Sequence, residues 1–137
     1  MPHVNIQYTA NLGAEAGMDA LCMTLCEVIG AQRDGAGARV FPLGGTRVLA
    51  YPAPHFAVGD GQPDRCFVYL QVRIAPGRER ALVTATGEAL IAAVRAHFAT
   101  IFATRAIGIT LQIDEGAPVF DAKHSTLHPL FAGQEPR

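Results

Sequence analysis

The chain has 137 residues, 50% of them hydrophobic, with a formal net charge of −1 and a pI near 6.5. This length suits one domain, over 1–137, whose core needs no disulfide or metal. The balanced charge provides no basic surface for nucleic acid, and no apolar stretch reaches the ~20 residues of a membrane span. A secretory signal pattern is also missing, so we expect a cytoplasmic protein that binds neither nucleic acid nor membrane.

The first half of the sequence predicts a strand, a helix and a second strand. Polar and apolar residues alternate over 2–9, which is the period of a half-buried strand. The three-to-four spacing of apolar residues over 18–29 predicts an amphipathic helix, followed by an exposed loop over 32–39. A second strand over 46–51 leads into Pro52, which confines that strand to a sheet edge.

The second half repeats this order. Residues 66–74 alternate most clearly and predict a strand, and a long helix follows from about residue 79 to residue 104. Gly87 lies in the apolar stripe of that helix, which suggests either close contact with the sheet or a tolerated glycine. A last strand covers 107–113, and the three prolines after residue 116 predict a wrapping arm or a loose tail.

These elements predict an α/β (α+β) fold of order β-α-β-β-α-β, in two halves of about 2–56 and 65–115 with a C-terminal arm over 116–137. A strand-helix-strand unit favours a parallel crossover, so we expect a four-stranded sheet with both helices on one face. Phe67 and Tyr69 would then point to the opposite face. Their apolar character suggests that this face is buried in an oligomer.

The cysteines indicate structural thiols. Cys22 and Cys26 lie four residues apart in the predicted helix, and Cys66 lies in a predicted strand. An odd number without framework spacing argues against a disulfide-built domain. The histidines show no ligand spacing with this pair, so we expect no metal site.

Pro2 is a candidate catalytic group because only Met1 precedes it. If that methionine is removed, the chain begins with a secondary amine, which can act as a nucleophile or a base. An α-amino group ordinarily titrates near pH ~7.7–8.0, so burial or nearby cations could leave it neutral at physiological pH. Many proteins begin Met-Pro without catalysis, so position 2 needs support from the rest of the chain.

Two arginines could provide that support. Arg47 begins the second predicted strand and Arg78 precedes the long helix, where side chains gather at the edge of a β-α-β sheet. The planar guanidinium suits a carboxylate, because it offers two parallel charge-assisted hydrogen bonds. The same charges would favour the neutral form of a neighbouring amine. Taken singly, either arginine is more often a solvated surface charge.

The chain resembles the 5-carboxymethyl-2-hydroxymuconate isomerase family of the tautomerase superfamily. The resemblance rests on six segments in the same order over nearly the whole chain. They are Met1-Pro2-His3, Phe41-Pro42-Leu43-Gly44-Gly45-Thr46-Arg47, Asp60-Gly61-Gln62-Pro63-Asp64 with Phe67-Val68-Tyr69, Gly77-Arg78, Gly87-Glu88-Ala89-Leu90 with His97-Phe98, and Leu127-His128-Pro129-Leu130-Phe131.

The resemblance implies a tautomerase-like homotrimer that needs no metal or organic cofactor. Its reaction would move a proton between carbons of an unsaturated 2-hydroxy or 2-oxo acid with two or three carboxylates, in homoprotocatechuate catabolism. Pro2 would be the base, Arg47 and Arg78 would bind the substrate carboxylates or the enolate, and Phe41 and Phe67 would line the pocket. Two alternatives stay open: hydration, dehalogenation or keto-enol tautomerisation at the same site, and a trimeric binding protein without turnover.

Overall fold

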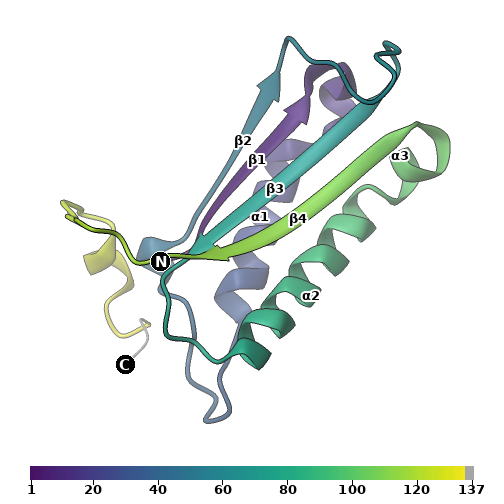
Figure 1. Ribbon diagram of the computed structural model, residues 1–137. Coiled ribbons are helices and arrows are strands. Elements are labelled where there is room, and N and C mark those ends of the chain that lie inside the picture. The colour runs from purple at the N-terminus through teal and green to yellow at the C-terminus, as the bar shows by residue number, and fades with distance from the viewer. Residues whose placement is uncertain (135–137) are drawn as a thin grey trace.

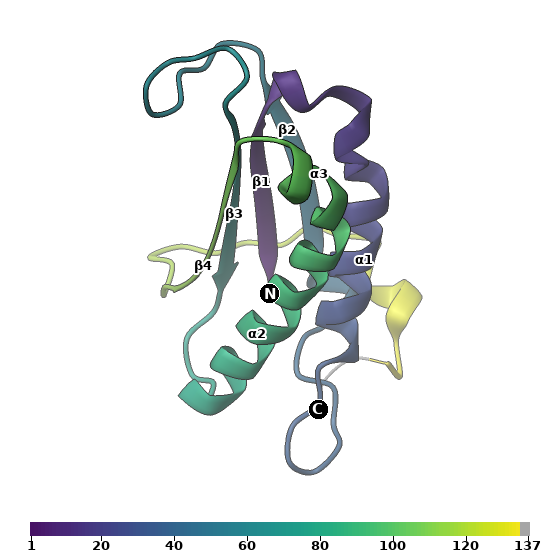
Figure 2. The same cartoon turned by 90° about the vertical axis from the view of Figure 1, so that its right-hand side faces the viewer.

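The computed structural model describes residues 1–134 and shows the predicted order of strands and helices. Four strands form one sheet of order β2-β1-β3-β4, and both main helices cover the same face of it (Figure 1; Figure 2). The fold class is therefore confirmed. The strands are β1 (His3–Thr9), β2 (Arg47–Ala53), β3 (Cys66–Ile74) and β4 (Ile107–Glu115).

The sheet joins the two halves through its middle strands. β1 pairs in parallel with β2, β3 pairs in parallel with β4, and β1 and β3 are antiparallel neighbours. β2 extends to Ala53 and so includes Pro52. Because β2 is an outer strand, as predicted, a residue without an N–H is tolerated there.

The core lies between the sheet and the helices α1 (Met18–Ala31) and α2 (Arg80–His97). Alternate residues of β1 and β3 point into it, which explains their period of two. Gly87 of α2 confirms the close approach of helix and sheet: a Cβ there would lie 3.3 Å from Cδ1 of Ile113. The fully buried side chains include Ile6, Leu12, Leu21, Leu25, Ile29, Leu70, Leu90 and Phe98.

The long second helix is not continuous, contrary to the prediction. It is divided into α2 and the short α3 (Ala99–Thr104) at Phe98, whose backbone has φ −94° and ψ 8°. Phe98 is completely buried, and the preceding His97 is held by Ala16, whose carbonyl oxygen lies 2.6 Å from Nε2. Phe102, which the helical period placed in the buried stripe, lies in α3 and is 63% exposed.

The N-terminus and the described part of the C-terminal arm lie at one end of the sheet (Figure 1). After β4 the chain passes the N-terminus and runs away from the helices, ending in the 3-10 turn η3 (His128–Phe131) (Figure 1). η3 packs near η2 (Leu43–Gly45), the 3-10 turn that precedes β2. The predicted arm is exposed over 117–127, and its last three residues, 135–137, lie outside the described range.

Candidate active site

Pro2 lies buried directly before β1, against the turn η2. Its carbonyl oxygen accepts a hydrogen bond of 3.0 Å from the backbone N–H of Arg47. The side chain of Met1 packs on Gly45 so closely that a Cβ on this glycine would lie 2.5 Å from Sδ of Met1. Residue 45 therefore has to be small wherever residue 1 occupies this place.

Arg47 is held at the same end of the sheet. Its Nη1 donates hydrogen bonds of 2.8 Å to the carbonyl oxygens of Gly44 and Thr46, so the guanidinium is fixed to η2. The charge of Arg47 also helps to lower the pKa of His3, after burial and the N-terminal amine. Arg47 thus contributes a positioned cation next to the first residues of β1.

Arg78 lies over the ring of Phe41, with Cζ 4.5 Å from the ring centroid. Its Nη1 donates to the carbonyl oxygen of Ala75 at 3.1 Å, and its Nη2 donates to that of Val40 at 3.4 Å. Burial lowers the pKa of Arg78, and the nearby carboxylate of Glu115 partly opposes this shift. The ring and the carbonyls hold the guanidinium in one place, as a binding cation requires.

The N-terminal amine lies in a positive environment. Partial burial lowers the pKa of the Met1 amine below its ordinary value, and the charges of Arg78 and Lys123 lower it further. Asp121, from the same arm as Lys123, acts in the opposite direction. Burial and cations both favour the neutral amine, which is the form that can accept a proton.

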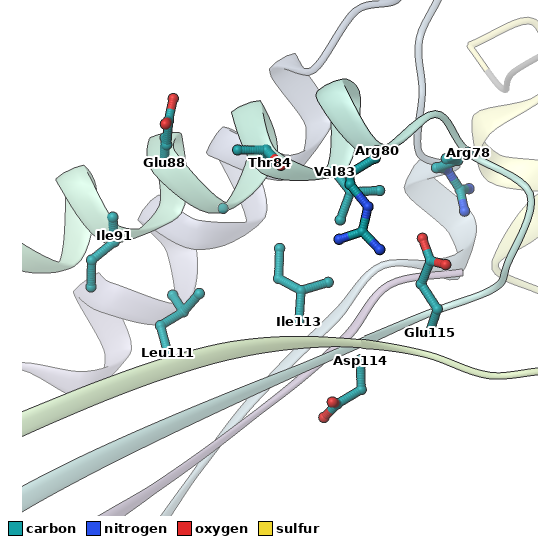
Figure 3. Close-up of a pocket in the computed structure, with 11 residues that line it drawn as sticks. Arg78, Arg80, Val83, Thr84, Glu88, Ile91, Leu111, Ile113, Asp114 and Glu115 are labelled. Carbon is teal, nitrogen blue, oxygen red and sulfur yellow. The ribbon is translucent and has the colours of Figure 1, made fainter.

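A hollow of about 710 Å³ opens beside Arg78, between the first turns of α2 and the end of β4. Its apolar wall includes Ile113, and its mouth carries the side chains of Arg78, Arg80 and Glu115 (Figure 3). The other two acidic residues that line it, Glu88 and Asp114, point away from this mouth (Figure 3). The arrangement combines an apolar wall with cations, which suits an organic anion.

The structure brings four of the five predicted site residues, Pro2, Arg47, Arg78 and Phe41, to one end of the sheet and places Phe67 elsewhere. Phe41 is only 1% exposed and supports Arg78 from beneath. Phe67 begins the far part of β3, where its N–H donates to Oγ1 of Thr9, about six residues from the end that pairs with His3. At ~3.3 Å per residue this is roughly 20 Å, so Phe67 does not reach Pro2 within one chain.

Sequence reasoning missed Arg80, which lines the same hollow as Arg78. The sequence feature that could have indicated it is a second arginine two residues after Arg78, at the start of the long helix. Within residues 1–134, no three His, Cys, Asp or Glu side chains are grouped in a way that could hold a metal ion, and no helix is long and apolar enough to cross a membrane. Cys22 and Cys26 are half-buried, and burial raises the pKa of both thiols.

Comparison with known proteins identifies the family. Residues 2–131 match the family model of 5-carboxymethyl-2-hydroxymuconate isomerase. The chain belongs to this isomerase family. It is therefore an enzyme, and the resemblance of the six segments is confirmed.

Individual relatives agree over almost the whole length. The 5-carboxymethyl-2-hydroxymuconate Delta-isomerase of Escherichia coli is 27% identical over 96% of this chain and 99% of its own. A crystal structure of a 5-carboxymethyl-2-hydroxymuconate delta-isomerase is 44% identical, with a TM-score of 0.91 over 96% of this chain and 93% of that one. An isomerase structure from Deinococcus radiodurans R1 is 31% identical, with a TM-score of 0.84 over 95% and 93% of the two chains.

More distant structures share the fold alone. A fused 4-OT wild-type symmetric trimer shares it at 23% identity, with a TM-score of 0.53 over 82% of this chain and 85% of that chain.

Proposed function

We propose that this enzyme moves a proton between carbons of an unsaturated 2-hydroxy or 2-oxo acid with two or three carboxylates, with Pro2 as the base. The substrate class follows the names of its relatives, 5-carboxymethyl-2-hydroxymuconate isomerases, and would place the enzyme in cytoplasmic homoprotocatechuate catabolism. The observation that supports the role of Pro2 is its buried place directly before β1, where its carbonyl oxygen accepts the N–H of Arg47; burial and Arg78 also lower the pKa of the neighbouring Met1 amine.

The base requires removal of Met1. While Met1 is present, the Pro2 nitrogen is an amide and has no basic lone pair. Once Met1 has been removed, the secondary amine of Pro2 lies one residue from the described amine, near Arg78 and beside the space that Met1 occupied on Gly45. Burial and the charge of Arg78, which lower the pKa of the Met1 amine, would act in the same direction on the pKa of this nitrogen.

The reaction balances without a cofactor. Neutral Pro2 takes a proton from the enol hydroxyl or from a carbon, and the electron pair of the broken bond spreads over a dienolate. Arg47 and Arg78 stabilise the oxygen charge of this intermediate. The protonated nitrogen then returns the proton to a different carbon, which shifts the double bond and regenerates the base.

We also propose that residues 1–137 form one domain and that the enzyme is a homotrimer. The face of the sheet opposite the helices exposes Leu49 and Tyr51 by 48% and 52%, and the arm exposes Phe120 by 84%. Apolar surface of this kind commonly marks an interface between subunits. Analytical ultracentrifugation tests the assembly, and a stable monomer at micromolar concentration would contradict it.

The test of the mechanism is a Pro2→Ala variant whose removal of Met1 is verified by intact mass. We expect kcat/KM on a 2-hydroxymuconate-type substrate to fall by about 10²–10⁴-fold, the usual contribution of a positioned general base. Met23→Ala, at an exposed position of α1 away from this end of the sheet, is the control and should keep its activity. Unchanged turnover by the proline variant would remove Pro2 from the mechanism.

A further inference from the structure

We infer that Arg80 binds a second carboxylate of the substrate and so selects dicarboxylates over monocarboxylates. This inference rests on the proposed function, because the hollow that Arg80 lines is joined to the N-terminal site only through Arg78. Arg78 lines the hollow and also lowers the pKa of the N-terminal amine. A substrate held by Arg78 next to the base would therefore extend into the hollow.

The guanidinium of Arg80 is free to bind. It begins α2, and within residues 1–134 it has no hydrogen bond or ion pair. Its side chain crosses the mouth of the hollow above Ile113, toward the end of β4 (Figure 3). Arg78, in contrast, already donates to two backbone carbonyls and lies on the ring of Phe41. Among the described residues, all donors of the Arg80 guanidinium are thus uncommitted, whereas those of Arg78 are partly used.

The shape and spacing suit a short diacid. Val83, Leu111 and Ile113 line the hollow with apolar side chains that can contact a carbon chain. Arg78 and Arg80 are two residues apart, so their Cα atoms are separated by at most about 7 Å. Two guanidiniums on neighbouring positions can thus hold the two ends of one small molecule, each with a charge-assisted pair of hydrogen bonds.

Glu115 makes Arg80 necessary for this selection. Its carboxylate lies at the same mouth and is near enough to raise the pKa of Arg78, although it forms no ion pair with either arginine within the described chain. Two guanidiniums and one carboxylate leave a net charge of +1. Without Arg80 the mouth is neutral, and a second substrate carboxylate would face Glu115 without a free cation. A monocarboxylate held by Arg78 would not meet this repulsion.

The first experiment measures binding without turnover. Calorimetric titrations with adipate, a six-carbon dicarboxylate, and hexanoate, its monocarboxylate counterpart, compare the wild type with Arg80→Gln. We expect adipate to bind about tenfold more weakly to the variant, as for the loss of a charged hydrogen bond at an exposed site, and hexanoate to bind equally well to both. Arg80→Lys keeps the positive charge but loses the two parallel N–H donors of the guanidinium, and should retain part of the affinity for adipate.

Arg95→Gln is the matched control, because Arg95 is another exposed arginine of α2 and lines a separate hollow at its far end. This variant should bind adipate and hexanoate with the same affinities as the wild type. Equal weakening of adipate and hexanoate by Arg80→Gln, unchanged adipate binding, or the same loss in Arg95→Gln would each overturn the inference.

The second experiment measures kinetics and separates this inference from the proposed function. Arg80→Gln should raise KM for a 2-hydroxymuconate-type dicarboxylate with little change in kcat, and should leave KM for a 2-hydroxydienoate with a single carboxylate unchanged. If the trimmed wild type binds adipate selectively but isomerises neither acid, the proposed function fails while the role of Arg80 stands. If both acids are isomerised and KM changes equally for both, the role of Arg80 fails alone.

Discussion

Replacing Phe41 with leucine should lower both the stability and the kcat/KM of the enzyme, because the buried ring of Phe41 holds the guanidinium of Arg78 in place. The ring is 1% exposed, and the guanidinium of Arg78 lies 4.5 Å from its centroid. A buried Phe→Ala change costs ~3–5 kcal/mol, so the smaller change to leucine should cost roughly 1–2 kcal/mol through lost packing. Loss of the contact between cation and ring adds about 0.5–1 kcal/mol, the lower part of its range because Arg78 is only half-buried.

A double-mutant cycle in urea separates the two contributions to the free energy of unfolding. Phe41→Leu, Arg78→Gln and the double variant should give a coupling energy of about 0.5–1 kcal/mol. Phe98→Leu is the matched control, because this ring is equally buried and none of the described residues places a guanidinium over it.

The same coupling between Phe41 and Arg78 should be measurable in kcat/KM. Phe41→Leu should lower kcat/KM several-fold in the wild type, since a displaced Arg78 binds the substrate less well, and should have no further effect once residue 78 is glutamine. Strict additivity of the two changes, in both unfolding and kcat/KM, would refute the view that the ring positions the guanidinium.

Three further outcomes follow from the described contacts. Arg78→Gln should raise the pKa of the N-terminal amine, because the arginine charge opposes its protonation; in the trimmed enzyme the acid limb of the kcat/KM profile should then move to higher pH, and an unmoved limb would contradict this. Thr9→Val should destabilise the fold by about 1–3 kcal/mol in urea titrations, because Oγ1 of this buried residue accepts the N–H of Phe67 at 3.0 Å; an unchanged midpoint would show that another group satisfies the amide. Cys22 and Cys26 should react slowly with a disulfide reagent at pH 8 until the protein is unfolded, because burial raises the pKa of both thiols; rapid labelling of the native protein would argue against that burial.

Local pattern was sufficient for most of the fold. The period of two in 66–74 and the three-to-four spacing in 18–29 correspond to β3 and α1, since each period reflects one face turned to the core. Pro52 correctly placed its strand at the sheet edge, because a residue without an N–H is tolerated where that side of the strand has no partner to receive a hydrogen bond. The divided helix was missed because Phe98 and Phe102 fit one helical stripe, and only the tertiary packing buries one and exposes the other.

The candidate site depended on contacts between distant segments. The sequence by itself determined which residue types could carry the chemistry: a proline behind the first methionine and arginines at element boundaries. The register of β1 with β2 then decided that Arg47 meets Pro2, and the chain path after β3 decided that Arg78 lies on Phe41 and shares a hollow with Arg80. Side-chain periodicity reports only the local direction of a residue, whereas these meetings depend on how strands and helices are packed, which no short stretch of sequence encodes.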